Sequence, residues 1–405
     1  MRIEHLRLDR NRRTARLAAQ FIWEDCAHPP CELYFETDAE FGDALSETAD
    51  AFVAASLTPA LWAGERRIAV DEEVCPDLLE NLEIVRRLFQ HWFNVGSGAA
   101  RIEAAPRRRA VQRATPGRAA FFLSGGIDSL AALLANRSRV AAGHPLSITD
   151  AILVYGLEIE HDQPFGYVRD AMASIANEAG VTLIPVSSNV RALNPDWTFW
   201  YTAYMGPALC AVAHALGARI ANATIGADYD VPNLAPHGSH PLVEPNFSSH
   251  AVRMRYHGLT MSRLDKVRLV ASWPPGLAHL RVCNRPEIYE PGRLNCGECE
   301  KCVRTMLELL AAGARGWERI FLQHELSSER IERLYAPRKV QPFYAELIGP
   351  LADAGRPDLS AAVSRLLASA RGETGLTGRL RKFDRERLNG SLVSLKRALT
   401  ASPVN

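Results

Sequence analysis

Ala119-Ala120-Phe121-Phe122-Leu123-Ser124-Gly125-Gly126-Ile127-Asp128-Ser129 is the stretch that decides the fold of this chain. Its first five residues are apolar and suit a short buried strand, and the glycine pair lets the backbone turn sharply. A helical pattern follows and continues through Ala135. The first N–H groups of such a helix are unpaired and lie at its positive dipole end, so the turn is a natural place for an anion.

The same alternation of strand and helix continues downstream. Apolar runs predict buried strands at 151–155, 181–186 and 219–225, and helical patterns lie at 165–179 and 207–217. Strands that alternate with helices at this spacing form βαβ units with a parallel sheet covered on both faces. We therefore predict an α/β fold with a doubly wound parallel sheet, in which ligands lie beyond the carboxyl ends of the strands.

The regions on either side follow other patterns. Residues 1–100 contain a strand-like run at Glu32–Glu36 and a helical stretch at Leu78–Phe93, so we expect an N-terminal α+β domain. A linker rich in Gly, Ala and Pro should cover 101–117, the main domain 118–310, and a helical C-terminal region 311–405. Partner proteins, if any, would bind the terminal regions.

Composition excludes several classes of protein. The chain has 405 residues, of which 47% are hydrophobic and 23% are charged, and its formal net charge is +1. A nearly balanced charge argues against wholesale binding to nucleic acid. The sequence shows no apolar run long enough to span a bilayer and no apolar N-terminal signal segment, so we expect a cytoplasmic protein.

The polar residues of the glycine turn suit a nucleotide phosphate. Ser124 and Ser129 supply hydroxyl donors, and the Asp128 carboxylate is a suitable ligand for Mg²⁺. The turn has no Gly-Lys-Ser/Thr end, as a Walker A loop would, and it lacks the GxGxxG spacing of a dinucleotide fold. It therefore belongs to neither of these common phosphate-binding loops.

The pattern Ser-Gly-Gly-x-Asp-Ser after a first buried strand resembles the PP-loop of the ATP pyrophosphatase superfamily. The resemblance implies an adenine nucleotide alpha-hydrolase-like fold and an enzyme that cleaves ATP between its α- and β-phosphates. It implies that pyrophosphate is bound by Ser124, Gly125, Gly126, Ile127, Asp128 and Ser129. Such enzymes adenylate a substrate oxygen and release pyrophosphate, with Mg²⁺ held at the position of Asp128.

Four of the eight cysteines are clustered. Cys296, Cys299 and Cys302 have the spacing C-x2-C-x2-C, and Cys283 lies thirteen residues upstream of the first. Four thiolates can close a tetrahedral Zn²⁺ site, which has no open position for water and is structural. An iron–sulfur cluster also takes four cysteines and remains the alternative.

The cysteine pattern is similar to that of 7-cyano-7-deazaguanine synthase, one branch of the superfamily. That resemblance implies that Tyr155 and Gly156 border the nucleotide, that Asp228 faces the substrate, and that Arg263 or Lys266 reaches the phosphates. The likeness covers residues 118–310. The Tyr-Pro-Asp-Cys substrate segment of that branch is absent, and residues 231–234 read Val-Pro-Asn-Leu instead. The chemistry is therefore implied more strongly than a deazaguanine substrate.

Residues 236–258 are expected to form a polar loop over the substrate, with His237 and His240 on its substrate side. From these features we expect a ligase that uses ATP, Mg²⁺ and a small carboxylate-bearing substrate, with Asp128, Arg263 and Lys266 as catalytic residues. Ammonia or an amine would then displace AMP. A glutaminase nucleophile is not apparent, because residue 2 is Arg rather than Cys.

Three alternatives to this hypothesis stay open. A tRNA-thiolating enzyme would bind RNA through its terminal regions. A ligase could attach a small molecule to a partner protein. A nucleotide-binding module inside a complex would bind ATP without turnover.

Overall fold

The computed structural model describes residues 1–96, 98, 100–109, 111, 113, 116–160 and 162–371. Within them the chain has an α/β fold with one ten-stranded sheet. The strands are β1 (Arg2–Arg10), β2 (Thr14–Ile22), β3 (Cys31–Asp38), β4 (Arg67–Val70), β5 (Arg101–Glu103), β6 (Arg118–Phe122), β7 (Ile148–Tyr155), β8 (Thr182–Ser188), β9 (Ile220–Gly226) and β10 (Arg253–His257). The α-helices are α1 (Asp50–Ala63), α2 (Pro76–Phe93), α3 (Ile127–Arg139), α4 (Asp162–Glu178), α5 (Trp197–Phe199), α6 (Met205–Ala215), α7 (Arg263–Ala271), α8 (Pro274–Ala278), α9 (Glu300–Ala311), α10 (Ser328–Glu332), α11 (Gln341–Ala345), α12 (Ile348–Asp353) and α13 (Pro357–Arg371).

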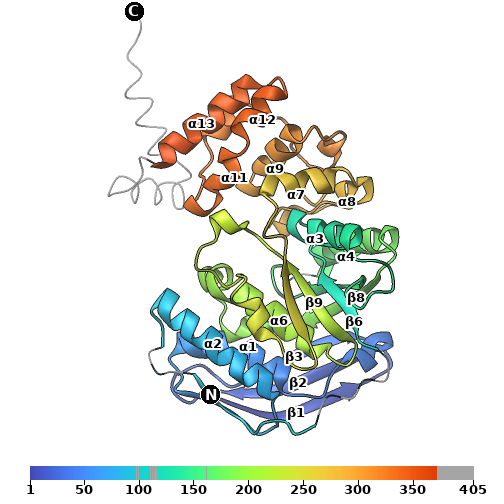
Figure 1. The fold of residues 1–405 in the computed structure, drawn as a ribbon, viewed down its shortest axis with the longest axis vertical. Coiled ribbons are helices and arrows are strands. Elements are labelled where there is room, and N and C mark those ends of the chain that lie inside the picture. Colours follow the sequence, from blue (N-terminus) through green and yellow to red (C-terminus); the bar gives the residue numbers. More distant parts are fainter. Residues whose placement is uncertain are drawn as a thin grey trace, which may run out of the picture. The chain divides into compact units, whose positions relative to one another are not determined.

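The sheet is mostly parallel, and its strand order is β10-β9-β6-β7-β8-β3-β2-β1-β4-β5 (Figure 1). From β10 to β8 every pair of neighbours is parallel, as the alternation of strands and helices predicts. The pairs β8–β3, β3–β2 and β2–β1 are antiparallel, and the pairs β1–β4 and β4–β5 are parallel again. The carboxyl ends of β6, β7, β8 and β9 therefore lie along one edge of the sheet.

Most of the elements predicted from apolar patterns are confirmed. The strands expected from 119, 151, 181 and 219 correspond to β6, β7, β8 and β9, and the three predicted helices between them are α3, α4 and α6. The predicted polar loop at 236–258 is wrong in part. Its last residues, Arg253–His257, form β10 at the edge of the sheet, where a strand tolerates polar side chains.

The first hundred residues and the region from residue 118 share the same sheet. Phe35, Glu36 and Thr37 of β3 pair with Ser188, Ser187 and Val186 of β8. The region expected to be a linker also contains β5, which pairs with β4. The expected boundary near residue 100 therefore falls between two parts of one sheet. By compactness the chain forms one unit of Met1–Cys296 with Gly316–Leu322, and a second of Gly297–Arg315 with the described residues from Gln323 onward.

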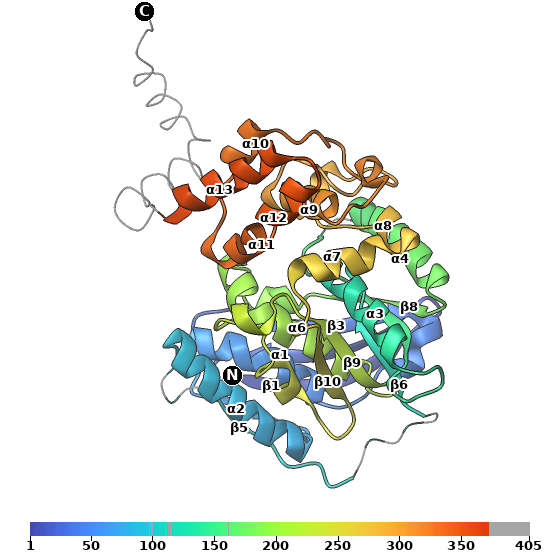
Figure 2. The same cartoon turned by 45° about the horizontal axis from the view of Figure 1, so that its top comes forward.

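Helices of the first unit cover both faces of its sheet (Figures 1 and 2). On one face α1 packs against α6 and α2, and on the other α3 packs against α7 and α4 against α8. The first face buries aromatic side chains, since the Phe52 ring of α1 lies 5.6 Å from that of Phe35 and 6.2 Å from that of Phe21. The hydroxyl of Tyr204 donates to the carbonyl of Ala55 at 2.7 Å. Burial of this apolar area supplies the main driving force for folding.

The second unit is helical. Helix α13 packs against α10, α11 and α12, and α12 also contacts α9. Arg304 on α9 is buried and bonds to Glu300 at 2.8 Å and Glu308 at 3.0 Å, and the Tyr344 hydroxyl donates to Glu300 at 3.1 Å. These buried charges are paired, as low-dielectric surroundings require. The part of the predicted helical region after residue 371 lies outside the described residues.

Candidate functional site

The glycine turn lies where β6 passes into α3. Gly125 has φ of +77°, a left-handed conformation that glycine adopts without a steric penalty, and Gly126 caps the helix in an extended conformation. The Ser124 hydroxyl accepts from the N–H of Gly126 at 3.2 Å and lies 3.2 Å from the Ser129 hydroxyl, which donates to the Gly126 carbonyl at 2.9 Å. The two serines therefore hold the turn in place at the start of α3.

Asp128 in the first turn of α3 meets two cations. Its Oδ2 lies 2.8 Å from Nη1 of Arg263, and its Oδ1 lies 3.2 Å from Nζ of Lys266. Both cationic side chains are almost fully buried, and Lys266 also donates to the carbonyl of Ala227. Burial alone would raise the pKa of Asp128, but the charges of Arg263 and Lys266 outweigh it and lower the pKa below its ordinary value. The carboxylate is therefore ionised, and the two neighbouring cations balance its negative charge.

Helix α7 supplies these two cations. The Ser262 hydroxyl accepts from the N–H of Asp265 at 3.2 Å and caps the helix. Arg263 and Lys266 therefore both lie at the N-terminal end of α7, about one turn apart. Gly226 at the end of β9 lets α3 approach, because a Cβ atom there would lie 2.4 Å from the carbonyl oxygen of Asp128. The structure thus brings together all three side chains predicted to be catalytic.

Tyr155 and Gly156 follow β7, as predicted. The Tyr155 hydroxyl lies 3.0 Å from the Glu160 carbonyl oxygen and 2.9 Å from Asp162 Oδ1. Burial, and then the hydrogen bond to Asp162, raise the pKa of Tyr155 to about 12. Gly156 has φ of +91°, and a Cβ atom there would lie 2.1 Å from the Ser188 carbonyl oxygen. Glycine is therefore required where the ends of β7 and β8 meet.

The residues predicted to face a substrate lie around the segment after β9. The backbone N–H of Asp228 donates to the Tyr256 hydroxyl at 3.3 Å. The His237 ring lies 6.4 Å from the Tyr229 ring and accepts from the N–H of Ser239 at 3.2 Å. His240 is buried against the Trp92 ring at 4.9 Å, and burial lowers its pKa. His240 thus packs against α2, whereas His237 stays partly exposed beside Tyr229.

Glu244, which sequence reasoning did not single out, is a buried carboxyl group near these residues. Its Oε2 accepts from the N–H of His240 at 2.6 Å. Within the described part of the chain its Oε1 is buried and has no hydrogen-bond partner. Burial raises the pKa of Glu244 to about 8, which favours its neutral form near neutral pH.

Arg281 was also missed by sequence reasoning, although it contacts the glycine turn. Its backbone N–H donates to the Gly125 carbonyl at 2.9 Å, and its Nη1 donates to the Ser124 carbonyl at 3.2 Å. Its Nε donates to the Tyr289 hydroxyl at 2.9 Å, and Glu158 lies 3.6 Å from its Nη2. The side chain is 9% exposed. Arg281 is therefore a third cationic side chain near this turn, in addition to Arg263 and Lys266.

Asn295 holds the segment that carries Arg281. Its Oδ1 accepts from the N–H groups of Val282 at 2.8 Å and Cys283 at 3.3 Å. Its Nδ2 donates to the carbonyls of Leu280 at 2.8 Å and Ile320 at 3.2 Å. The side chain is fully buried and uses both ends of its amide. Asn295 precedes Cys296 in the chain, so the cysteine segment helps to fix the place of Arg281.

The four clustered cysteines are close together, as the spacing predicts. The sulfur atoms of Cys283, Cys296, Cys299 and Cys302 all lie within 4.8 Å of one another. In a tetrahedral site with Zn–S bonds of about 2.3 Å, sulfurs are about 3.8 Å apart, so this donor set can hold a structural metal ion. Gly297 has φ of +77°, and a Cβ atom there would lie 1.6 Å from the Gln323 carbonyl oxygen. The turn between the cysteines therefore needs glycine.

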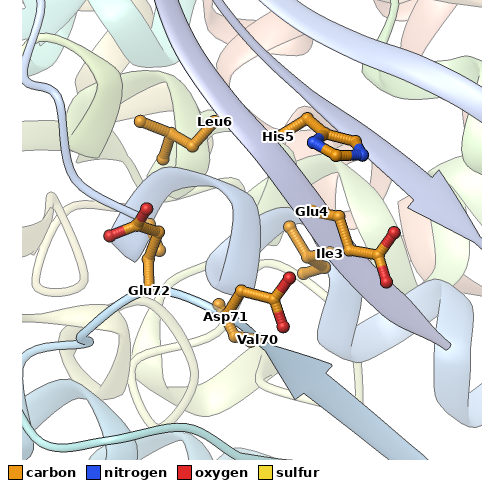
Figure 3. Close-up of a pocket in the computed structure, with 8 residues that line it drawn as sticks. Ile3, Glu4, His5, Leu6, Val70, Asp71 and Glu72 are labelled. Carbon is orange, nitrogen blue, oxygen red and sulfur yellow. The ribbon is translucent and has the colours of Figure 1, made fainter.

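A hollow of about 240 Å³ lies between β1 and the end of β4. Figure 3 shows the side chains of Glu4, Asp71 and Glu72 around it, with His5 beside them. Glu4 pairs with Arg2. None of the residues of the glycine turn lines this hollow.

Comparisons of the chain with protein-family models, with curated proteins and with solved structures found no match. Within the described ranges, none of the helices combines the length and the apolar character that crossing a membrane requires.

Proposed function

We propose that this chain is an ATP-dependent synthetase of the PP-loop ATP pyrophosphatase kind, built on a doubly wound, adenine nucleotide alpha-hydrolase-like fold. One observation carries the proposal. Asp128 in the first turn of α3 is bound by Arg263 at 2.8 Å and Lys266 at 3.2 Å. A carboxylate, two buried cations and a glycine turn at a helix start are together the groups that a polyphosphate and its metal ion require.

Each group has a role in this proposal. The N–H groups at the start of α3 bind the pyrophosphate part of ATP, and Arg263 and Lys266 neutralise the charge that builds up on it as it leaves. Asp128 would hold Mg²⁺, because the phosphate oxygens would take over the hydrogen bonds of the two cations and leave the carboxylate oxygens free to coordinate the ion. Bound Mg²⁺ supplies Lewis-acid neutralisation of the phosphate oxygens.

The proposed reaction has two steps. An oxygen of a substrate carboxylate bonds to the α-phosphorus, and the bond to the oxygen that bridges the α- and β-phosphates breaks, so pyrophosphate leaves with the electron pair. The nitrogen of ammonia or an amine then attacks the activated carbonyl carbon, AMP leaves, and the nitrogen loses a proton. The product is an amide-type C–N bond, with AMP and pyrophosphate as the other products.

Zinc is the ion that we propose for the cysteine cluster. Four sulfur donors without a carboxylate or histidine leave no open coordination position, so the ion stabilises the fold and takes no part in the reaction. Elemental analysis of the purified protein separates this proposal from an iron–sulfur cluster, since we expect about one zinc per chain and no iron.

Pyrophosphate binding and ATP–pyrophosphate exchange test the proposed function. We expect the wild-type protein to bind pyrophosphate with Mg²⁺ and to exchange label with ATP when the correct acid is supplied. A carboxylate panel that includes 7-carboxy-7-deazaguanine serves as the screen. Asp128→Asn should lower exchange at least about 100-fold, the scale on which loss of an electrostatic group affects such reactions.

The matched control is Asp265→Asn, which changes an exposed aspartate in the first turn of α7 and should leave exchange unchanged. A wild-type protein that binds neither ATP nor pyrophosphate would exclude the proposal. Binding of ATP without exchange for any acid would favour a nucleotide-binding module instead.

A further inference from the structure

Arg281 is anchored beside the glycine turn by three hydrogen bonds. Its backbone N–H donates to Gly125, its Nη1 to the Ser124 carbonyl, and its Nε to the Tyr289 hydroxyl. The side chain is nine-tenths buried, and Asn295 fixes the backbone on its C-terminal side. These bonds give the guanidinium a fixed position relative to the turn.

One end of this guanidinium lacks a hydrogen bond. In the described part of the chain Nη2 has no acceptor within 3.5 Å, and its nearest carboxylate oxygen, Oε2 of Glu158, is 3.6 Å away. A guanidinium presents its donors in a planar fork that suits an oxyanion. Glu158 already pairs with the cation, and Nη2 is not among the side-chain nitrogens that are fully buried without a hydrogen-bond partner. This donor at the edge of the guanidinium is therefore accessible, and we take it as the one that an anionic ligand beside the turn would contact.

The position of Arg281 differs from that of the other two cations. Arg263 and Lys266 bind Asp128 inside the first turn of α3, whereas Arg281 binds the carbonyls of Ser124 and Gly125, before the N-cap residue of that helix. We propose that Arg281 binds an oxygen of the α-phosphate, the part of the nucleotide that remains after pyrophosphate has left. This inference rests on the proposed function and adds a residue that contacts the adenylate.

The chemistry gives Arg281 a separate task. When the carboxylate oxygen bonds to the α-phosphorus and the bridge to the β-phosphate breaks, negative charge is shared by the α-phosphate oxygens and the leaving pyrophosphate. Arg263 and Lys266 neutralise the leaving group, and Arg281 neutralises the group that stays. Glu158 repels the same anion, so it weakens AMP binding while it holds Nη2 in the absence of a ligand.

Binding of AMP and of pyrophosphate to the full-length protein, measured separately by calorimetry with Mg²⁺ present, tests this division. Arg281→Gln should weaken AMP binding at least about tenfold, the scale of a lost charge-assisted hydrogen bond, and leave pyrophosphate binding within about twofold. Arg263→Gln should do the reverse. Glu158→Gln should tighten AMP binding. Arg281→Lys, which keeps the positive charge, should retain part of the AMP affinity that Arg281→Gln loses. Arg293→Gln, which removes an exposed arginine paired with Glu290, should change neither.

The outcomes separate the two proposals. If the wild-type protein does not bind pyrophosphate, the proposed function fails. If pyrophosphate binds but Arg281→Gln weakens both ligands alike or neither, only this inference fails. A purely structural Arg281–Glu158 pair predicts that Glu158→Gln weakens AMP binding, which would also overturn the inference. Should Arg281→Gln fail to fold in a thermal melt, the sign of the Glu158→Gln effect still decides.

Discussion

Glu244 has a fully buried carboxyl group, which accepts a hydrogen bond from the N–H of His240. Its pKa is raised to about 8, against 4.5 for an ordinary glutamate. Between these values the folded chain keeps the proton and the unfolded chain releases it. The stability contributed by the neutral carboxyl is therefore complete below pH 4.5 and is lost progressively as the pH rises to about 8.

We predict that Glu244→Gln flattens the pH dependence of stability. As the pH rises from 5 to 8, the free energy of unfolding of the wild-type protein should fall by on the order of 1 kcal/mol per pH unit relative to that of this variant. Urea denaturation at several pH values measures the difference. Glu80→Gln, on the exposed face of α2, should follow the wild-type profile. Parallel profiles for the wild type and Glu244→Gln would contradict the prediction.

Among the individual residues of the candidate site, the sequence predicted the cluster around Asp128 but not Arg281. Asp128 was predicted from its place after the glycine pair, and Arg263 and Lys266 from the resemblance, and the three side chains do meet. Arg281 could not be predicted, because its contact with Ser124 joins residues 157 positions apart. No local pattern of residue types indicates such a contact.

At the scale of elements, the first turn of α3 depends on how closely β9 approaches it. A Cβ atom on Gly226 would lie 2.4 Å from the carbonyl oxygen of Asp128 and 2.7 Å from its carbonyl carbon. These are backbone atoms, which cannot rotate away as a side chain can. Any larger residue must therefore separate the two elements and move Asp128 relative to Lys266.

We predict that Gly226→Ala destabilises the protein by about 1–3 kcal/mol, the usual cost of overpacking, and weakens pyrophosphate binding. Thermal melts and calorimetry measure the two effects. Gly166→Ala is the matched control, since Gly166 is within α4 and a Cβ atom there has nothing within 4 Å. That change should be neutral or stabilising. Unaltered stability and binding in Gly226→Ala would refute the steric argument.

Some elements were predictable and others were not, for a physical reason. Strands β6 and β7 are buried, so their sequences are apolar runs that predict strands directly. Strand β10 reads Arg-Met-Arg-Tyr-His and lies at the edge of the sheet, where alternate side chains stay at least partly exposed. Such a segment has the composition of a polar loop, and only its pairing with β9 makes it a strand.

On the scale of the whole molecule, the first hundred residues complete the sheet that carries the site. Strand β8 pairs with β7 on one side and with β3 on the other. Side chains reinforce the second pairing, since Thr37 donates to the Pro185 carbonyl and Ser188 to that of Tyr34, both at 2.7 Å. A boundary near residue 100 is predicted because composition changes there, whereas pairing between distant strands leaves no trace in composition.

We predict that a chain beginning at residue 118 does not fold independently. It would expose the edge of β8 and the apolar face of α6 that α1 covers in the full chain. Unpaired edges and exposed apolar surface favour aggregation. Size-exclusion chromatography and circular dichroism of the truncated chain test this, and a monomer with a cooperative melt would disprove it.

The pairing of β3 with β8 also sets an order in time. The N–H of Tyr34 bonds to the side chain of Asn189, which is 155 residues further along the chain. During synthesis at about 5–20 residues per second, β3 waits roughly 8 to 30 seconds for its neighbour to leave the ribosome. Through that interval the backbone groups of a strand edge near the N-terminus are unpaired, so the nascent chain should depend on chaperones most strongly before residue 189 emerges.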